Sequence, residues 1–304
     1  MQRMAHTVKH SLQGILPAIV TPFDPEGRFD IAAFERLIAR LYAAGVHGLY
    51  VCGQTGEGLQ QPLEQRQRVA EAAVRCSPPG KLVIVHIGAA STAEAVELAR
   101  HASKIGVQAV SSLPPAGPFS FEEVRGYYRD LAAASGVPLL IYYFPSFSTA
   151  IRTSDQILEL CAIPNIVGLK FTDSDMFRLW LLRRAGAVVF NGSDEMLVAG
   201  LIMGANGGIG SIYNLLPERF VELYGHAISG RWQQARAMQD QINEVIEAIL
   251  HYPVHAAVKA VLRWRGLDCG DCIAPRRRLT AEEEAGLRAR LARTTLGAEW
   301  AAAE

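Results

Sequence analysis

The chain has 304 residues, of which 50% are hydrophobic and 20% are charged, a composition typical of a globular protein with a large core. Its 30 basic and 30 acidic residues cancel, which favours neither a nucleic-acid nor a membrane partner, and no apolar run reaches the ~18 residues of a membrane span. Residues 1–14 lack the hydrophobic segment of a signal peptide and five cysteines are a sparse set, so we expect a cytoplasmic protein.

Eight apolar segments bounded by turn residues are predicted to be buried strands. In chain order they cover residues 14–21, 47–53, 82–88, 109–113, 138–145, 166–173, 187–191 and 208–213. Helical patterns separate them, at residues 30–44, 62–76, 91–105, 120–135, 153–163, 175–184 and 195–203. Capping residues open several of these helices, namely Asp30, Ser91, Ser120 and Thr153. After the last strand only helices are predicted, at residues 217–229, 231–251, 253–264 and 280–294.

This alternation of strands and helices predicts an α/β protein. The strands are apolar almost throughout, as expected for a parallel sheet covered on both faces, and eight strand–helix units indicate a closed (β/α)8 TIM barrel. An open doubly wound sheet is disfavoured because no GxGxxG motif follows the first strand. We expect residues 1–214 to form the barrel, and residues 215–304 to form a C-terminal helical extension that packs on it and does not fold independently.

One predicted strand carries a lysine at its centre. The five lysines of the chain are Lys9, Lys81, Lys104, Lys170 and Lys259. Lys9 lies in a polar tail and Lys81 in a turn. Lys104 and Lys259 lie in helical patterns, where long cations reach solvent. Lys170 alone is expected to be buried, where the neutral amine is favoured and can attack a carbonyl group. The alternative is a buried ion pair between Lys170 and Asp173 or Asp194.

Alternation along the strands predicts which side chains face the barrel interior. Gly168 and Thr172 share the face of Lys170, whereas Val167, Leu169 and Phe171 are expected to face the helices. In the neighbouring strand, either Tyr142 or Tyr143 must point inward.

Active sites of such barrels lie at the carboxyl ends of the strands, where the loop of residues 54–57 and the turn of residues 191–195 are also expected. Ser211 is placed in the eighth strand. An amine, a phenol, hydroxyl groups and carboxylates therefore converge, a set suited to imine chemistry on a keto acid.

Three motifs carry a family resemblance: Gly53-Gln-Thr-Gly-Glu57, Tyr142-x-x-Pro145 and Gly168-Leu-Lys170. Over residues 14–214 the chain resembles the pyruvate-dependent class I aldolases, a family that includes N-acetylneuraminate lyase and dihydrodipicolinate synthase. The resemblance implies that Lys170 forms the covalent imine, that no other cofactor is needed, and that Tyr142 relays protons. It also implies that Thr55, with the neighbouring backbone, binds the substrate carboxylate, that Gln54 is among the substrate-binding residues, and that the protein is a homotetramer.

Within the family the chain is most similar to the N-acetylneuraminate lyase branch. Gly192-Ser-Asp194-Glu195 and Ser211-Ile-Tyr-Asn214 resemble that branch's motifs, and so does Thr172 two residues after the lysine. The resemblance implies that Gly192, Asp194 and Glu195 hold the hydroxyl-rich tail of a sugar acid, which is cleaved to pyruvate and an aldehyde. Thr172 and Ser211 are also expected to bind substrate. A simpler role for Asp194 and Glu195 is to cap a helix N-terminus.

The chain also departs from the family pattern. Gln54 stands where a Ser or Thr is usual, the segment at residues 114–117 lacks a tyrosine, and Phe147 lies where dihydrodipicolinate synthases carry an arginine. Two alternatives therefore stay open. The imine could serve dehydration or a synthase-like condensation, or the protein could bind keto acids without catalysis.

The remaining candidates are expected to be structural. Glu57 is expected to fix its loop, and Arg276-Arg-Arg278 to be a solvated run. The lone pair of Cys269 and Cys272 lacks the further ligands of a zinc site. Five further ring-bearing side chains are expected to pack in the core, at its rim or between layers: His47, His86, Trp180, Trp232 and Trp264.

Overall fold

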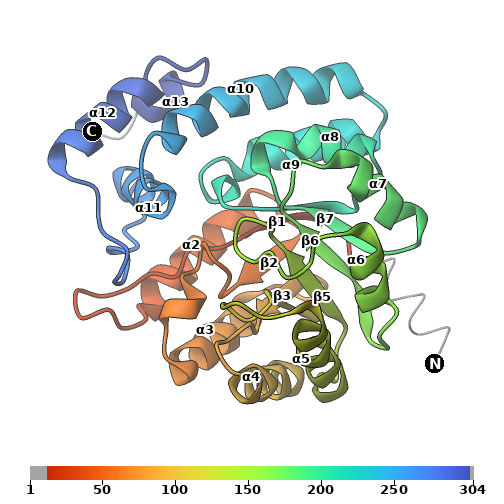
Figure 1. Ribbon diagram of the computed structural model, residues 1–304. Helices are drawn as coiled ribbons and strands as arrows, with labels where there is room; N and C mark the ends of the chain where they lie inside the picture. Colours follow the sequence, from red (N-terminus) through yellow and green to blue (C-terminus); the bar gives the residue numbers. More distant parts are fainter. Residues whose placement is uncertain (1–11, 302–304) are drawn as a thin grey trace.

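Eight parallel strands form the centre of the computed structural model, which describes residues 12–301 (Figure 1). They are β1 (Gly14–Pro17), β2 (Gly48–Val51), β3 (Leu82–His86), β4 (Ala109–Ser112), β5 (Leu139–Tyr143), β6 (Ile166–Phe171), β7 (Val188–Asn191) and β8 (Gly207–Gly210). Each strand pairs with its neighbour in sequence from β2 to β8, and β8 pairs with β1. A bridge between Ala18 and Tyr50 joins the β1 and β2 sides, so the sheet is a nearly closed barrel, which confirms the predicted TIM-barrel fold.

Seven helices alternate with the strands, and four of them begin directly after a cap predicted from the sequence. They are α2 (Ile31–Ala43), α3 (Leu63–Cys76), α4 (Thr92–Ile105), α5 (Phe121–Ala134), α6 (Ser154–Cys161), α7 (Met176–Arg184) and α8 (Leu197–Ile202). The side chains of Asp30, Ser91, Ser120 and Thr153 each accept a hydrogen bond from the backbone N–H three residues later. These bonds satisfy N–H groups that have no partner inside the helix, which is why the four helices start there.

The C-terminal helices gather on one side of the barrel (Figure 1). They are α9 (Pro217–Ile228), α10 (Trp232–Leu250), α11 (Val254–Trp264), α12 (Ala281–Leu291) and the unpredicted α13 (Ala298–Ala301). Three 3-10 turns lie between regular elements, η1 (Gly58–Gln60), η2 (Asp194–Met196) and η3 (Ile212–Asn214). Among the described helices none alone has the length and apolar character to cross a membrane; α10 and α11 reach it only as a pair bent by 111°.

Two apolar layers follow the alternation of the strands. Leu169 and Phe171 pack between strands and helices, as predicted. Val167 was expected there too but packs against the cluster inside the barrel. The reason is a shift of register between β5 and β6, where Leu139 pairs with Ile166 and the next residue pairs with Gly168. Val167 falls within this irregularity, so simple alternation does not hold for it.

Two further expectations were wrong. Strand β8 ends at Gly210, and Ser211 adopts a helical conformation that opens η3, because the Asp194 carboxylate accepts a hydrogen bond from the Ile212 N–H at 2.7 Å. Trp180 and Trp232 do not pack between layers, since their exposed fractions are 38% and 39%. Trp264 is partly buried against the core, as expected.

Candidate active site

Lys170 lies near the carboxyl end of β6 inside the barrel, and only 4% of its surface is exposed. Its Nζ is 3.9 Å from the ring centre of Tyr142 and 4.7 Å from that of Tyr50. Within residues 12–301, this amine forms no hydrogen bond and no ion pair. The expected alternative of an ion pair with Asp173 is wrong, because that carboxylate pairs with Arg178 at 3.0 Å. Aromatic faces attract a cation without accepting a hydrogen bond from it, so among the described residues no acceptor group engages this amine.

The structure decides which of the two adjacent tyrosines faces the lysine. Tyr142 pairs in register with Lys170 and belongs to the interior cluster, where its ring stacks on Phe144 at 6.0 Å. Tyr143 points to the helix layer, stacks on Phe171 and accepts a hydrogen bond from Arg178 Nη1 at 2.6 Å. Tyr142 is therefore the phenol of the site.

Two aromatic side chains complete this environment. Tyr50 is fully buried, donates to Ser111 Oγ at 3.2 Å and meets the Tyr142 ring edge to face at 6.1 Å. His86 lies 6.0 Å from the same ring. Its Nε2 accepts a hydrogen bond from the Leu113 N–H, whereas its buried Nδ1 has no hydrogen-bond partner among the described residues, so the expected satisfied core histidine holds for one ring nitrogen only. Burial lowers the pKa of His86 well below its usual value and raises that of Tyr50 well above, so both are neutral at neutral pH.

Sequence reasoning missed Tyr50. Alternation within β2 separates it from Leu49 and Val51, which belong to the outer core. That pattern could have placed the phenol inside the barrel, but not opposite Lys170.

The loop after β2 brings two predicted residues together. Thr55 is 3% exposed, and its Oγ1 lies 2.6 Å from Ser211 Oγ at the end of β8. The carbonyl of the next residue, Gly56, accepts hydrogen bonds from Thr21 Oγ1 at 2.8 Å and Gln61 Nε2 at 2.7 Å. Two hydroxyl groups thus form a fixed pair at the barrel mouth, which can bind a carboxylate.

The C-terminal region also reaches this loop. Lys259 was expected in solvent, but it is 1% exposed and forms an ion pair with Glu57 at 2.8 Å. Arg276, expected in a solvated run, donates to Gln54 Oε1 at 3.4 Å and lies 2.9 Å from His255 Nδ1. Arg277 and Arg278 are exposed as expected, so the expectations fail only for Lys259 and Arg276. The reason is that each of these two has a partner in a loop about 200 residues earlier in the chain.

A second group of predicted residues lies after β6 and β7. The Gly192 N–H donates to the Phe171 carbonyl at 2.7 Å, and a Cβ atom at position 192 would lie 2.1 Å from Thr172 Oγ1. Among the described residues, that buried hydroxyl has no hydrogen-bond partner. Glycine therefore keeps room beside a hydroxyl that a substrate group could satisfy.

The two acidic residues of the next turn, Asp194 and Glu195, differ in burial. Asp194 is 8% exposed and Glu195 is exposed, with its carbonyl bonded to the Asn243 side chain at 3.2 Å. The Asp194 carboxylate does not cap the helix that follows it but accepts a hydrogen bond from the Ile212 N–H at the start of η3, and a Cβ atom at Gly210 would lie 2.0 Å from its Oδ1. Burial raises the pKa of Asp194 to about 7, against the opposing effects of the Ile212 and Ser211 N–H groups and the Lys170 charge.

This pKa predicts how stability varies with pH. The unfolded carboxyl titrates near 3.8 and the folded one near 7, so the folded state binds more protons in between. Stability therefore falls as pH rises from about 4 to about 7. We expect the neutral variant Asp194→Asn to melt at least roughly 2 °C higher than the wild type at pH 8, and at a similar temperature at pH 4. Thermal scans at both pH values check this; an equal difference at both would contradict it.

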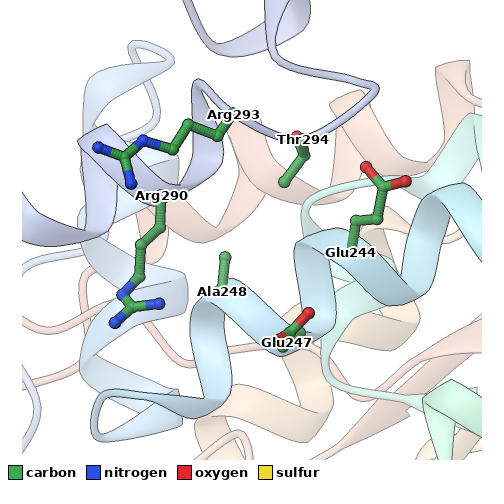
Figure 2. Close-up of a pocket in the computed structure, with 6 residues that line it drawn as sticks. All are labelled: Glu244, Glu247, Ala248, Arg290, Arg293 and Thr294. Carbon is green, nitrogen blue, oxygen red and sulfur yellow. The ribbon is translucent and has the colours of Figure 1, made fainter.

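A separate cavity of about 240 Å³ lies among the C-terminal helices (Figure 2). It is lined by residues of α10 and α12 and of the segment after α12: Glu244, Glu247, Ala248, Arg290, Arg293 and Thr294. It shares no lining residue with the group around Lys170.

Phe147, which stands where dihydrodipicolinate synthases carry an arginine, packs against the interior cluster next to Phe144.

Comparisons with known proteins agree with this arrangement. Residues 11–294 match the model of the dihydrodipicolinate synthetase family. The N-acetylneuraminate lyase of Rhizobium meliloti (strain 1021) is 38% identical over 280 residues, which cover 91% of this chain and 93% of that protein. The N-acetylneuraminate lyase of Salmonella typhimurium (strain LT2) is 37% identical, with coverage of 84% and 87%.

Solved structures show the same relation. The Ruminococcus gnavus sialic acid aldolase superposes with a TM-score of 0.88 at 28% identity, covering 92% of this chain and 96% of that one. The Proteus mirabilis N-acetylneuraminate lyase gives a TM-score of 0.85 at 31% identity, with coverage of 92% and 97%. The chain therefore belongs to the dihydrodipicolinate synthetase family and is a lyase of the class I aldolase type.

Proposed function

We propose that this protein reversibly cleaves a 2-keto-3-deoxy sugar acid of the sialic acid type into pyruvate and an aldehyde, through a Schiff base on Lys170. The observation that carries the proposal is a buried amine held by two aromatic rings, with no carboxylate paired to it among the described residues. The names of the sequence relatives and of the similar structures support the choice of substrate. The imine itself serves as the electron sink, so the reaction needs neither a metal nor an organic cofactor.

In the proposed reaction, the Lys170 amine adds to the C2 carbonyl carbon. The Tyr142 hydroxyl then gives its proton to the C2 hydroxyl group, which leaves as water, so that a protonated imine and a Tyr142 phenolate form together. The C4 hydroxyl loses its proton to the Tyr142 phenolate, and the C3–C4 bond breaks to release the aldehyde. The electron pair of that bond moves into the imine, which becomes a neutral enamine. Protonation at C3 and addition of water then release pyruvate and restore the amine.

We propose two binding subsites around this centre. Thr55, Ser211 and Gln54 hold the keto-acid carboxylate. Arginine only donates hydrogen bonds, so the Gln54 carbonyl must face Arg276, which leaves the Gln54 amide N–H groups available to the substrate. Thr172, Gly192, Asp194 and Glu195 bind the hydroxyl-rich tail, a role supported for the first three by their position at the ends of β6 and β7.

The proposal extends to the assembly and location of the protein. We propose a cytoplasmic homotetramer in which residues 1–214 and 215–304 act as one unit. Free thiols at all five cysteines support a reducing compartment, and the family resemblance supports the tetramer. A crystal structure, or a measurement of the molecular mass of the purified protein in solution, would test the oligomeric state.

Trapping the imine is the direct test of this function. The protein is incubated with pyruvate and borohydride, and its peptides are mapped by mass spectrometry. We expect a reduced pyruvyl adduct on the peptide that contains Lys170, and no adduct in Lys170→Met. The matched control is Lys104→Met, because that lysine is exposed on α4 and its loss should leave the adduct unchanged. Folded wild-type protein without an adduct would overturn the proposal.

Product analysis separates the proposed cleavage from the alternatives that use the same imine. We expect sialic acid to yield pyruvate and N-acetylmannosamine in equal amounts. Dehydration would instead keep the carbon chain intact, and a synthase-like reaction would consume pyruvate only with another aldehyde. An adduct on Lys170 without turnover of any sugar acid would favour a keto-acid-binding protein.

A further inference from the structure

A buried ion pair connects the C-terminal region to the loop after β2. Lys259, in α11, places its Nζ 2.8 Å from Glu57 Oε1 and 2.9 Å from the Asp271 carbonyl. The same Nζ lies 4.2 Å from the ring centre of Phe23. The other carboxylate oxygen of Glu57 accepts a hydrogen bond from the Ile273 N–H at 2.9 Å. The side chains of the pair are only 2% and 0% exposed, so both charges are removed from water.

Stability alone does not account for a buried ion pair of this kind. Desolvating two charges costs free energy that their attraction recovers only in a favourable geometry, so a buried pair is weak evidence for stabilisation. Here Glu57 also has a φ of 53°, in the left-handed region that non-glycine residues rarely adopt. A backbone conformation of this kind persists where the surrounding contacts determine it. Lys259 and the Ile273 N–H supply those contacts.

The constrained residue controls the position of Thr55. The Glu57 N–H donates to the Gln54 carbonyl at 3.0 Å, which closes a turn with Thr55 inside it. The Thr55 hydroxyl reaches Ser211 at 2.6 Å on the inner side of this turn, while Glu57 is held from the outer side by α11. A change in the Glu57 backbone must therefore move the Thr55 hydroxyl relative to Lys170.

We propose that Lys259 is a positioning residue for the reaction: through Glu57 it fixes Thr55 where that hydroxyl binds the keto-acid carboxylate. The inference rests on the proposed function, because it takes this carboxylate as the ligand of Thr55. The carboxylate is bound equally in the imine and in the transition state, so loss of the positioning should weaken binding and leave the chemical step nearly unchanged.

The test uses the full chain with Lys259→Met. The pyruvate concentration that gives half-maximal borohydride trapping on Lys170 is expected to rise about ten-fold or more, with kcat for sugar-acid cleavage within about three-fold of wild type. Leu287→Ala is the matched control, since it removes a fully buried side chain from α12 and should lower the melting temperature without changing that concentration. A merely structural role would lower the fraction of active protein and leave half-saturation unchanged.

A double-mutant cycle shows whether Lys259 acts through Thr55. In a Thr55→Val background, Lys259→Met is expected to raise the half-saturating pyruvate concentration by less than about two-fold; the full effect in that background would overturn the inference.

If Lys259→Met does not fold, Glu57→Gln combined with Lys259→Met leaves no unpaired buried charge, and its half-saturation should still rise. Unchanged half-saturation in that folded variant would also overturn the inference. Failure of the proposed function looks different, because wild-type protein would then give no adduct at any pyruvate concentration.

Discussion

Replacing Lys170 with methionine is expected to lower kcat for sugar-acid cleavage by at least about 10⁴-fold, because within residues 12–301 no other amine lies inside the barrel to form the imine. Lys259, the other buried lysine among the described residues, is committed to Glu57. The measurement is pyruvate release under saturating substrate, with Lys104→Met as the control that keeps wild-type activity. A loss smaller than about ten-fold would remove Lys170 from the centre of the mechanism.

The same variant should fold at least as well as the wild type. Lys170 keeps a buried amine that has no carboxylate partner in the part of the chain that the structure describes, and methionine fills similar space without that polar group. Thermal unfolding of Lys170→Met is therefore expected at an equal or higher temperature. Together with the loss of activity, this result would show a residue retained for chemistry at a cost in stability. Unfolded Lys170→Met protein would point to a structural role.

Tyr142→Phe is expected to lower kcat by roughly 10² to 10⁴-fold, the usual contribution of a positioned proton-transfer group. The substitution keeps the ring, and with it the stacking on Phe144 and the contact with the Lys170 amine. Binding of pyruvate should therefore persist, and borohydride trapping should still label Lys170. Single-turnover cleavage assays, run beside the trapping assay, separate the two steps.

Tyr143→Phe is the matched control for this prediction. Its hydroxyl faces the helix layer and accepts a hydrogen bond from Arg178, so its loss should cost about 1 kcal/mol of stability and leave kcat within about two-fold. Equal losses of kcat in the two variants would contradict the assignment of Tyr142 as the proton relay.

The sequence by itself determined the elements and the reactive group. Caps such as Ser120 and Thr153 place helix starts correctly because they act on N–H groups within three residues. The apolar strands separated by helices predict a parallel barrel, since both faces of such a strand must be buried. The lysine at the centre of an apolar strand predicts an imine-forming amine, and the motifs around Thr55, Tyr142 and Lys170 predict the family.

Only the tertiary structure decided which groups meet. Alternation leaves the face of a strand undefined until its neighbours are placed, so Tyr142 and Tyr50 could not be positioned over Lys170 from their own segments. The register shift beside Val167 belongs to a pair of strands and to neither alone. Lys259 looked like a solvated helical lysine because its partner, Glu57, lies in a loop that is distant in sequence. Burial and pairing depend on such long-range contacts, whereas helix caps and apolar runs depend on local sequence.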